Sequence, residues 1–135
     1  MKVELTRTAD YAIRAVLAIA DSRTDGLTTA DIIRKAEIPA AYAPQVLSRL
    51  VRGSIVTSKP GPNGGYRLRD SASRVSLLAV IEAAEGPMEA TRCVMRGSRC
   101  SPARPCRIHP VMAEARASMR GVLAAITLER LRPES

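Results

Sequence analysis

The chain has 135 residues and a formal net charge of +8; 46% of its residues are hydrophobic, and its aromatic side chains are three tyrosines. This length allows one domain with an appended element, and its core must be aliphatic. The positive charge favours an anionic partner, nucleic acid first. Because so few aromatic residues are available for base stacking, the expected partner is double-stranded DNA rather than a single strand.

Other classes of protein fit the composition less well. The longest apolar run, residues 15–20, is far too short to cross a bilayer, and the first seven residues lack the apolar core of a secretion signal. We therefore expect a cytoplasmic protein without a membrane partner. The single histidine has no nearby acid, and no set of nucleophile, base and orienting group is apparent, so an enzyme is not expected.

Three helices are predicted in the first 52 residues. Apolar residues recur at helical spacing over residues 6–21. A short second helix ends near Ala36; Thr28 or Thr29 can cap it, with Asp31 in its first turn. Pro39 breaks the chain, and a third helix runs to Arg52 with a proline in its first turn. Two helices joined by a tight turn are typical of a helix-turn-helix motif.

The third helix is the candidate for reading DNA. Its outward side is predicted to carry Gln45, Ser48, Arg49 and Arg52. Glutamine can pair with adenine edges in the major groove, and arginine with guanine or phosphate. An ordinary amphipathic surface helix with a solvated charged face would show the same pattern, so this helix alone does not decide the function.

A basic hairpin is predicted directly after this motif. Strands are expected over residues 55–58 and 66–69, around a strong turn at 59–65. A hairpin in this position is typical of a wing, in which glycines let the backbone approach another backbone or a phosphate closely. Residues 1–74 carry 12 basic and 7 acidic groups, an excess placed where phosphates would lie. The candidate contacts of the wing are Lys59, Gly64, Gly65 and Arg67.

A helix over residues 75–85, ended by a glycine and a proline, leads to the cysteine loop, residues 93–109. This loop holds Cys93, Cys100, Cys106 and His109, which are all the cysteines and the only histidine of the chain. Five arginines and no acid lie between residues 91 and 110, and positive charge stabilises the thiolate that serves as metal ligand and nucleophile.

Three interpretations of the cysteine loop remain open. An odd number of cysteines argues against a disulfide with a spare thiol, and the absence of a paired Cys-x₂-Cys knuckle argues against a structural zinc site of three cysteines and one histidine. An iron–sulfur cluster also suits thiolate ligands, but three cysteines leave one iron for His109 or for a group elsewhere. The spacing alone does not separate zinc from iron.

A last long helix is predicted over residues 111–131, which contain no proline. At about 1.5 Å per residue it would be roughly 30 Å long, more than a domain of this size needs for its own core. Its apolar stripe is therefore expected to pair with a second copy, although the helix could instead fold back on its own domain. The stripe comprises Val111, Ala115, Met119, Val122 and Ile126.

The order of these elements resembles the Rrf2 family of bacterial transcription regulators over nearly the whole chain. Residues 8–14 resemble the family's opening helix, 38–47 its turn and recognition helix, 61–68 its wing, and 127–131 the end of its dimerisation helix. The resemblance implies a mainly α fold with a small β-hairpin wing. It also implies a winged helix-turn-helix DNA-binding domain over residues 1–74, and a cluster-binding loop with dimerisation helices over 75–135.

The resemblance further implies a homodimeric repressor or activator that senses redox state, nitric oxide, or iron or cluster status through one iron–sulfur cluster, 2Fe-2S or 4Fe-4S, per subunit. The matching ligands are Cys93, Cys100 and Cys106. The fourth is either His109 or Asp10 from the partner's first helix. The candidate contacts to the DNA operator are Thr28, Tyr42, Gln45, Ser48, Arg49, Arg52, Lys59, Gly64, Gly65 and Arg67.

The chain departs from the family pattern in three places. The gap from Cys93 to Cys100 is one residue longer than the commonest spacing, which leaves the cluster type open. Pro60 stands at the wing position of a family arginine that enters the minor groove, and Pro44 replaces an acidic base-reading residue, so we expect a different operator. A metal-free regulator that responds to oxidation of the same cysteines is the alternative function.

Overall fold

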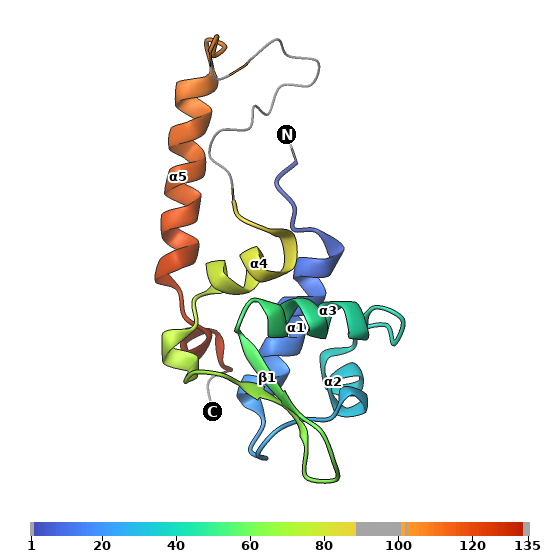
Figure 1. Ribbon diagram of the computed structural model, residues 1–135. Coiled ribbons are helices and arrows are strands. Elements are labelled where there is room, and N and C mark those ends of the chain that lie inside the picture. Colours follow the sequence, from blue (N-terminus) through green and yellow to red (C-terminus); the bar gives the residue numbers. More distant parts are fainter. Residues whose placement is uncertain (1, 89–100, 102, 134–135) are drawn as a thin grey trace.

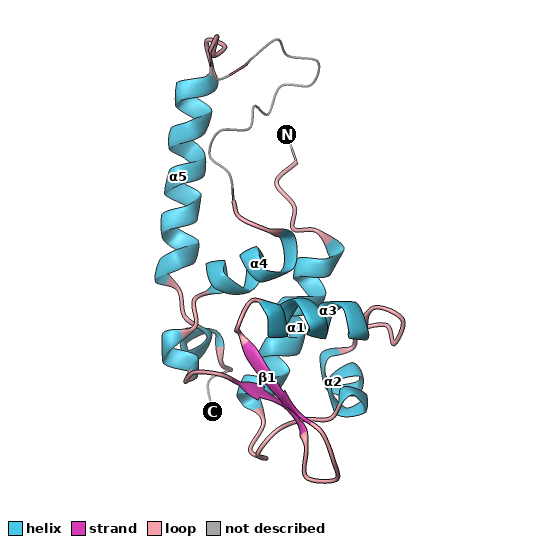
Figure 2. Cartoon of the chain, in the orientation of Figure 1, coloured by secondary structure: helices cyan, strands magenta, loops and turns pink. Residues whose placement is uncertain are grey.

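The structure is a computed structural model that describes residues 2–88, 101 and 103–133 (Figure 1). Helices dominate the described part of the chain, with one two-stranded sheet (Figure 2). The predicted fold class is confirmed. In chain order the elements are α1 (Arg7–Asp21), α2 (Thr29–Ala36), α3 (Ala43–Arg52), β1 (Val56–Lys59), β2 (Gly65–Leu68), η1 (Ala72–Arg74), α4 (Leu77–Glu85), α5 (His109–Ala125) and η2 (Leu128–Leu131).

Side-chain caps start the first two helices. The Thr6 hydroxyl accepts a hydrogen bond from the Ala9 amide at the start of α1. At α2, Thr28 rather than Thr29 is the cap. Its hydroxyl accepts from the Asp31 amide over 3.2 Å, and the Asp31 carboxylate accepts from the Thr28 amide over 3.4 Å. These bonds favour the ionised carboxyl, so the pKa of Asp31 is lowered.

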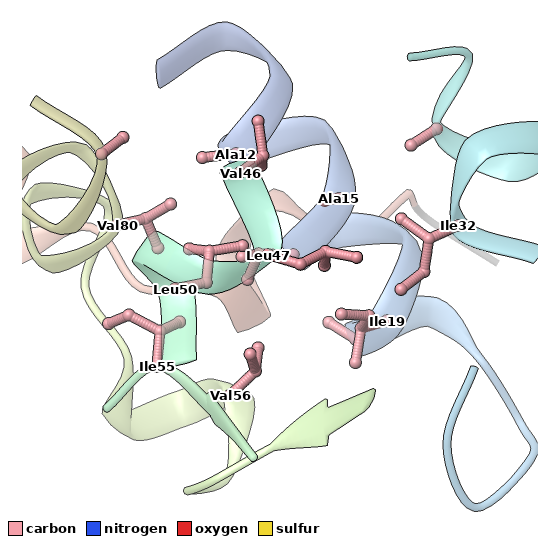
Figure 3. Packing of buried hydrophobic residues seen from close by; sticks show 14 of the residues in the cluster. Ala12, Ala15, Ile19, Ile32, Val46, Leu47, Leu50, Ile55, Val56 and Val80 are labelled. Carbon is pink, nitrogen blue, oxygen red and sulfur yellow. The ribbon is translucent and has the colours of Figure 1, made fainter. Parts of the chain in front are cut away.

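One aliphatic core holds the described elements other than α5 together, with α1 at its centre (Figure 3). The small side chains of Ala9, Ala12 and Ala15 are fully buried on α1, which lets neighbouring helices approach closely. Larger buried side chains from α2 and α3 fill the space around them, among them Ile32 and Leu50. The core continues past residue 74, because it also contains Val75, Val80, Ala84 and Leu128.

The wing forms where it was predicted, with each strand displaced by one residue. β1 and β2 pair antiparallel, from Val56 opposite Leu68 to Lys59 opposite Gly65. Leu27 also pairs with β2 as an isolated antiparallel bridge, since it exchanges two backbone hydrogen bonds with Tyr66. Gly65 has φ +129°, and a Cβ there would lie 2.6 Å from the Leu27 carbonyl oxygen, so the close approach of these backbones requires glycine.

The C-terminal segment differs from the prediction. A continuous helix over 111–131 is wrong: α5 ends at Ala125, the chain extends through residues 126–127, and a separate 3-10 turn, η2, follows. The Ile126 carbonyl accepts from the Leu77 amide over 2.8 Å, and the fully buried Leu128 draws η2 into the core. α4 also begins two residues later than predicted, because the Ser76 hydroxyl caps it.

The long helix α5 stands apart from the core and points away from the wing (Figure 1). None of its residues is fully buried. Its inner side packs on α4, and its outer side is open. In the part of the chain that the structure describes, no helix combines the length and apolar character that crossing a bilayer would require.

Candidate nucleic-acid interface and cysteine loop

Helices α2 and α3 form the helix-turn-helix motif. Glu37 ends α2 in the left-handed conformation, and the Tyr42 amide donates to the Pro39 carbonyl to close the turn before α3. One side of α3 is buried against α1 through Ala43, Val46, Leu47 and Leu50. Its exposed side carries Pro44, Gln45, Ser48 and Arg52. The structure thus places three of the four predicted recognition-helix contacts together in solvent.

The prediction that Arg49 points outward is wrong. Its side chain is turned toward α4, where Nη1 donates to the Ala84 carbonyl oxygen over 2.7 Å, and its Nε is buried without a hydrogen-bond partner. Arg49 lies between the exposed and buried sides of α3, and the end of α4 covers that flank. We therefore remove Arg49 from the candidate contacts to bases.

Tyr42 is half-buried at the start of α3, where its ring lies 5.3 Å from that of Tyr11. Its hydroxyl accepts from Arg7 Nη1 over 3.4 Å, and this contact raises the pKa of Arg7. Sequence reasoning did not place Arg7 beside Tyr42, one of the candidate contacts to DNA. No local pattern could have indicated it, because the crossing of α1 and α3 brings it there.

The remaining candidate contacts lie at the start of α2 and on the wing. Thr28 is exposed beside the first amides of α2, a position that suits a phosphate oxygen. Lys59 is exposed at the end of β1. Arg67 already forms an ion pair with Asp25 over 3.2 Å, so only part of its donor capacity is available to DNA. Gly64 is tightly packed, since a Cβ there would collide with the Lys59 carbonyl.

The cysteine loop is described only near its end, because Cys93 and Cys100 lie outside the described residues. Cys106 and His109 are both half-buried at the start of α5, where the His109 amide donates to the Cys106 carbonyl over 3.0 Å. A thiolate and an imidazole three residues apart are donor types that iron and zinc accept. Asp10 forms an ion pair with Arg14 over 3.1 Å, and both side chains are about half-exposed.

The part of the chain that the structure describes does not bring a complete ligand set together. Among residues 2–88, 101 and 103–133, no group of three or more histidine, cysteine or acidic side chains is arranged to hold a metal ion. Two of the three predicted cysteine ligands fall outside that part of the chain. The described donors therefore fit a metal centre by their chemistry.

A helix-turn-helix with an exposed polar face, followed by a basic wing, defines a DNA-binding protein of the winged-helix class. The profile of the Rrf2 family, described as an iron-dependent transcriptional regulator, matches residues 5–134. The chain is 35% identical over 130 residues to the HTH-type transcriptional regulator IscR of Klebsiella pneumoniae (strain 342), an alignment that spans 96% of this chain and 79% of the relative. The chain belongs to the Rrf2 family of transcription regulators.

Solved structures agree with this assignment at the level of the fold. CymR (YrzC), described as the global cysteine regulator of B. subtilis, superposes with a TM-score of 0.76 at 22% identity and covers 96% of both chains. IscR of T. potens gives a TM-score of 0.75 at 19% identity over 97% of this chain and 87% of that one. The relatives are transcription regulators, and membership of the same family confirms the prediction that the chain is not an enzyme.

Proposed function

We propose that this regulator senses redox state, nitric oxide, or iron or cluster status through an iron–sulfur cluster. The observation that carries the proposal is the gathering of every cysteine and the only histidine into residues 93–109 of a chain whose family is described as iron-dependent. The ligands would be Cys93, Cys100 and Cys106, with His109 or the partner subunit's Asp10 as the fourth.

The residues around these ligands suit a negatively charged centre. A bound cluster would supply a group that reacts with oxidants or nitric oxide and has an adjustable reduction potential. The five arginines between residues 91 and 110 favour deprotonated sulfur and offset the charge of the thiolates. Three thiolate bonds would tie the loop between α4 and α5, and their loss would release that tie.

The alternative is a metal-free regulator in which oxidation of the same cysteines is the signal. It is favoured by the same arginines, because a stabilised thiolate is also the more easily oxidised form, and by the partial exposure of Cys106. The two proposals differ in whether iron and acid-labile sulfide accompany the purified protein.

The test is anaerobic purification followed by iron and sulfide analysis, with Cys106→Ala, His109→Ala and Asp10→Ala as variants. A cluster protein should contain both elements and show a visible chromophore that Cys106→Ala loses. Of the other two, the variant that alters the spectrum identifies the fourth ligand. If the parent contains neither element but its DNA affinity falls on oxidation, the thiol alternative holds. If the parent contains neither element and its DNA affinity is the same before and after oxidation, both proposals fail.

We also propose how the protein meets DNA. Gln45, Ser48 and Arg52 of α3 would enter the major groove, and Thr28, Tyr42 and Lys59 would contact the backbone. Gly64 and Gly65 would let the wing turn tightly enough to present its tip to the duplex, and Arg67 would contribute the donors that Asp25 leaves unused. Two copies paired through α5 would recognise an inverted repeat with half-sites about one or two helical turns apart.

A further inference from the structure

The last turn of α4, residues 82–85, receives hydrogen bonds from several separate segments. Glu82 accepts from the Met88 amide over 3.0 Å, on the way into the cysteine loop, and from Arg120 of α5 over 3.5 Å. Glu85 accepts from the Thr6 amide over 2.7 Å, at the start of α1. Two acids in one helical turn thus fix α4 to the segment before the loop, to α5 and to α1.

The same turn holds the recognition helix. Arg49 of α3 donates to the Ala84 carbonyl, and Ala84 itself is 1% exposed. Next to this bond, a Cβ on Gly53 would lie 2.6 Å from the Cβ of Ala83. The C-terminal end of α3 therefore rests directly on the last turn of α4, with no room for even a methyl group between them.

Electrostatics explain why an arginine occupies this position. α4 has no basic residue in its own last turn, so its C-terminal carbonyls present partial negative charge without a local counter-ion. Arg49 supplies that counter-ion from another helix. Its buried Nε has no hydrogen-bond partner. The hydrogen bond from Nη1 to the Ala84 carbonyl is therefore a main contact that orients the guanidinium. A shift of α4 would weaken that bond and leave a partly buried charge poorly paired.

We propose that Arg49 is a positioning residue, which sets the recognition helix against the last turn of α4, and that this turn transmits the state of the cysteine loop to α3. The transmission rests on the proposed function, because it requires that the loop changes state. The positioning role does not, because it rests on contacts between described residues. Arg49 acts on DNA affinity through Ala84 and not through a phosphate or a base.

The first experiment measures affinity against salt concentration for a duplex selected by the parent protein from a random-sequence library. Arg49→Met keeps the aliphatic stem and removes the donors. We expect it to lower affinity roughly two- to thirtyfold, the range of indirect couplings, without changing the salt slope. Arg52→Met is the matched control, since it removes an exposed arginine from the same turn of α3. A slope reduced by about 0.9 in Arg49→Met, as loss of one phosphate contact produces, would overturn the positioning role.

The second experiment tests transmission with Cys106→Ser as the change of loop state. The DNA affinity of the parent is divided by that of Cys106→Ser. The same ratio, with and without Cys106→Ser, is then measured in proteins that also carry Arg49→Met or Arg52→Met. We expect the ratio to fall toward one with Arg49→Met and to persist with Arg52→Met. An undiminished ratio in the Arg49→Met background would overturn transmission through this contact.

Two further variants keep the test decisive. Arg49→Lys retains a charged donor, so the effect of Cys106→Ser on DNA affinity should be larger in this background than in the Arg49→Met background. A general loss of folding would not explain such a recovery. Glu82→Gln weakens the contacts of α4 with α5 and with Met88 without touching α3. If Arg49→Met fails to fold, an unchanged ratio in Glu82→Gln overturns transmission. If the parent and Cys106→Ser bind DNA with equal affinity, the proposed sensing function and the transmission both fail. The salt experiment still decides the positioning role of Arg49 in that case.

Discussion

The backbone amide of Leu128 donates to the carbonyl oxygen of Val75 over 3.0 Å. Ser76 and Thr127 pair beside this bond as an isolated antiparallel bridge. The start of α4 and the segment that follows α5 are therefore joined at one place by backbone hydrogen bonds. A change in the direction of α5 would therefore act on the core at the point where Leu128 is buried in it.

Leu128 should be the side chain that fixes this return. It is fully buried in the core shared with α1, whereas Leu131, in the same 3-10 turn, is 38% exposed. We expect Leu128→Ala to lower the free energy of unfolding by about 2–5 kcal/mol, from lost burial and the cavity left behind. Leu131→Ala should cost about 1 kcal/mol or less. Urea denaturation of both variants measures the difference, and equal effects would contradict the assigned anchor.

Gly53 should be intolerant of any side chain. An added Cβ would lie 2.6 Å from that of Ala83, so α3 and α4 would have to separate. We expect Gly53→Ala to destabilise the protein by about 1–3 kcal/mol and to weaken DNA binding. Gly121 of α5 is the contrast, because its Cβ would meet open space and alanine is the better helix former by about 1 kcal/mol. Thermal denaturation in which Gly53→Ala matches the parent would refute this packing.

Local signals predicted most of the DNA-binding unit. The cap at Thr28, the proline in the first turn of α3 and the glycine-rich turn of the wing each act over a few residues, and the structure places all three as expected. The aliphatic core was also predicted, because the chain contains no phenylalanine or tryptophan and only three tyrosines. These features depend on residues that are neighbours in the sequence, so the sequence alone is sufficient to predict them.

The misses have tertiary causes. Arg49 was assigned to the exposed side of α3 because periodicity cannot show that α4, 35 residues later, covers that flank. No glycine or proline follows Ala125 directly, so the sequence contains no local signal for the end of the helix. The break arises from the burial of Leu128. The metal ligands remain a prediction, because Cys93 and Cys100 fall outside the described residues.

Gln45 and Lys59 should affect DNA binding in different ways. Gln45 is neutral and exposed on α3, so Gln45→Ala should lower affinity for the selected operator by about 1–3 kcal/mol if it reads a base, with an unchanged salt slope. Lys59 is charged and exposed on the wing, so Lys59→Ala should reduce the slope by about one unit. Each variant is the control for the other in a salt titration of affinity. If neither changes binding, the DNA face is misplaced.

The outer side of α5 should join two copies of the chain. Val111 and Val122 are 65% and 64% exposed, and Ala115 and Met119 lie exposed between them on the same side of the helix. Ile126, the fifth member of the predicted stripe, lies beyond the end of the helix and is half-buried. Four apolar side chains on one open face are the pattern of a helix that lacks its partner.

Val122→Glu should break that pairing. A carboxylate in an apolar contact between helices loses its hydration without gaining a partner, at a cost of several kcal/mol, so the dimer dissociation constant should rise about a hundredfold or more. Ala117→Glu places the same charge on a different side of α5 and should leave the dimer intact. Light scattering at micromolar concentration distinguishes the two variants. A parent protein that is monomeric under these conditions and still binds its operator would rule out pairing through α5 as a requirement for DNA recognition.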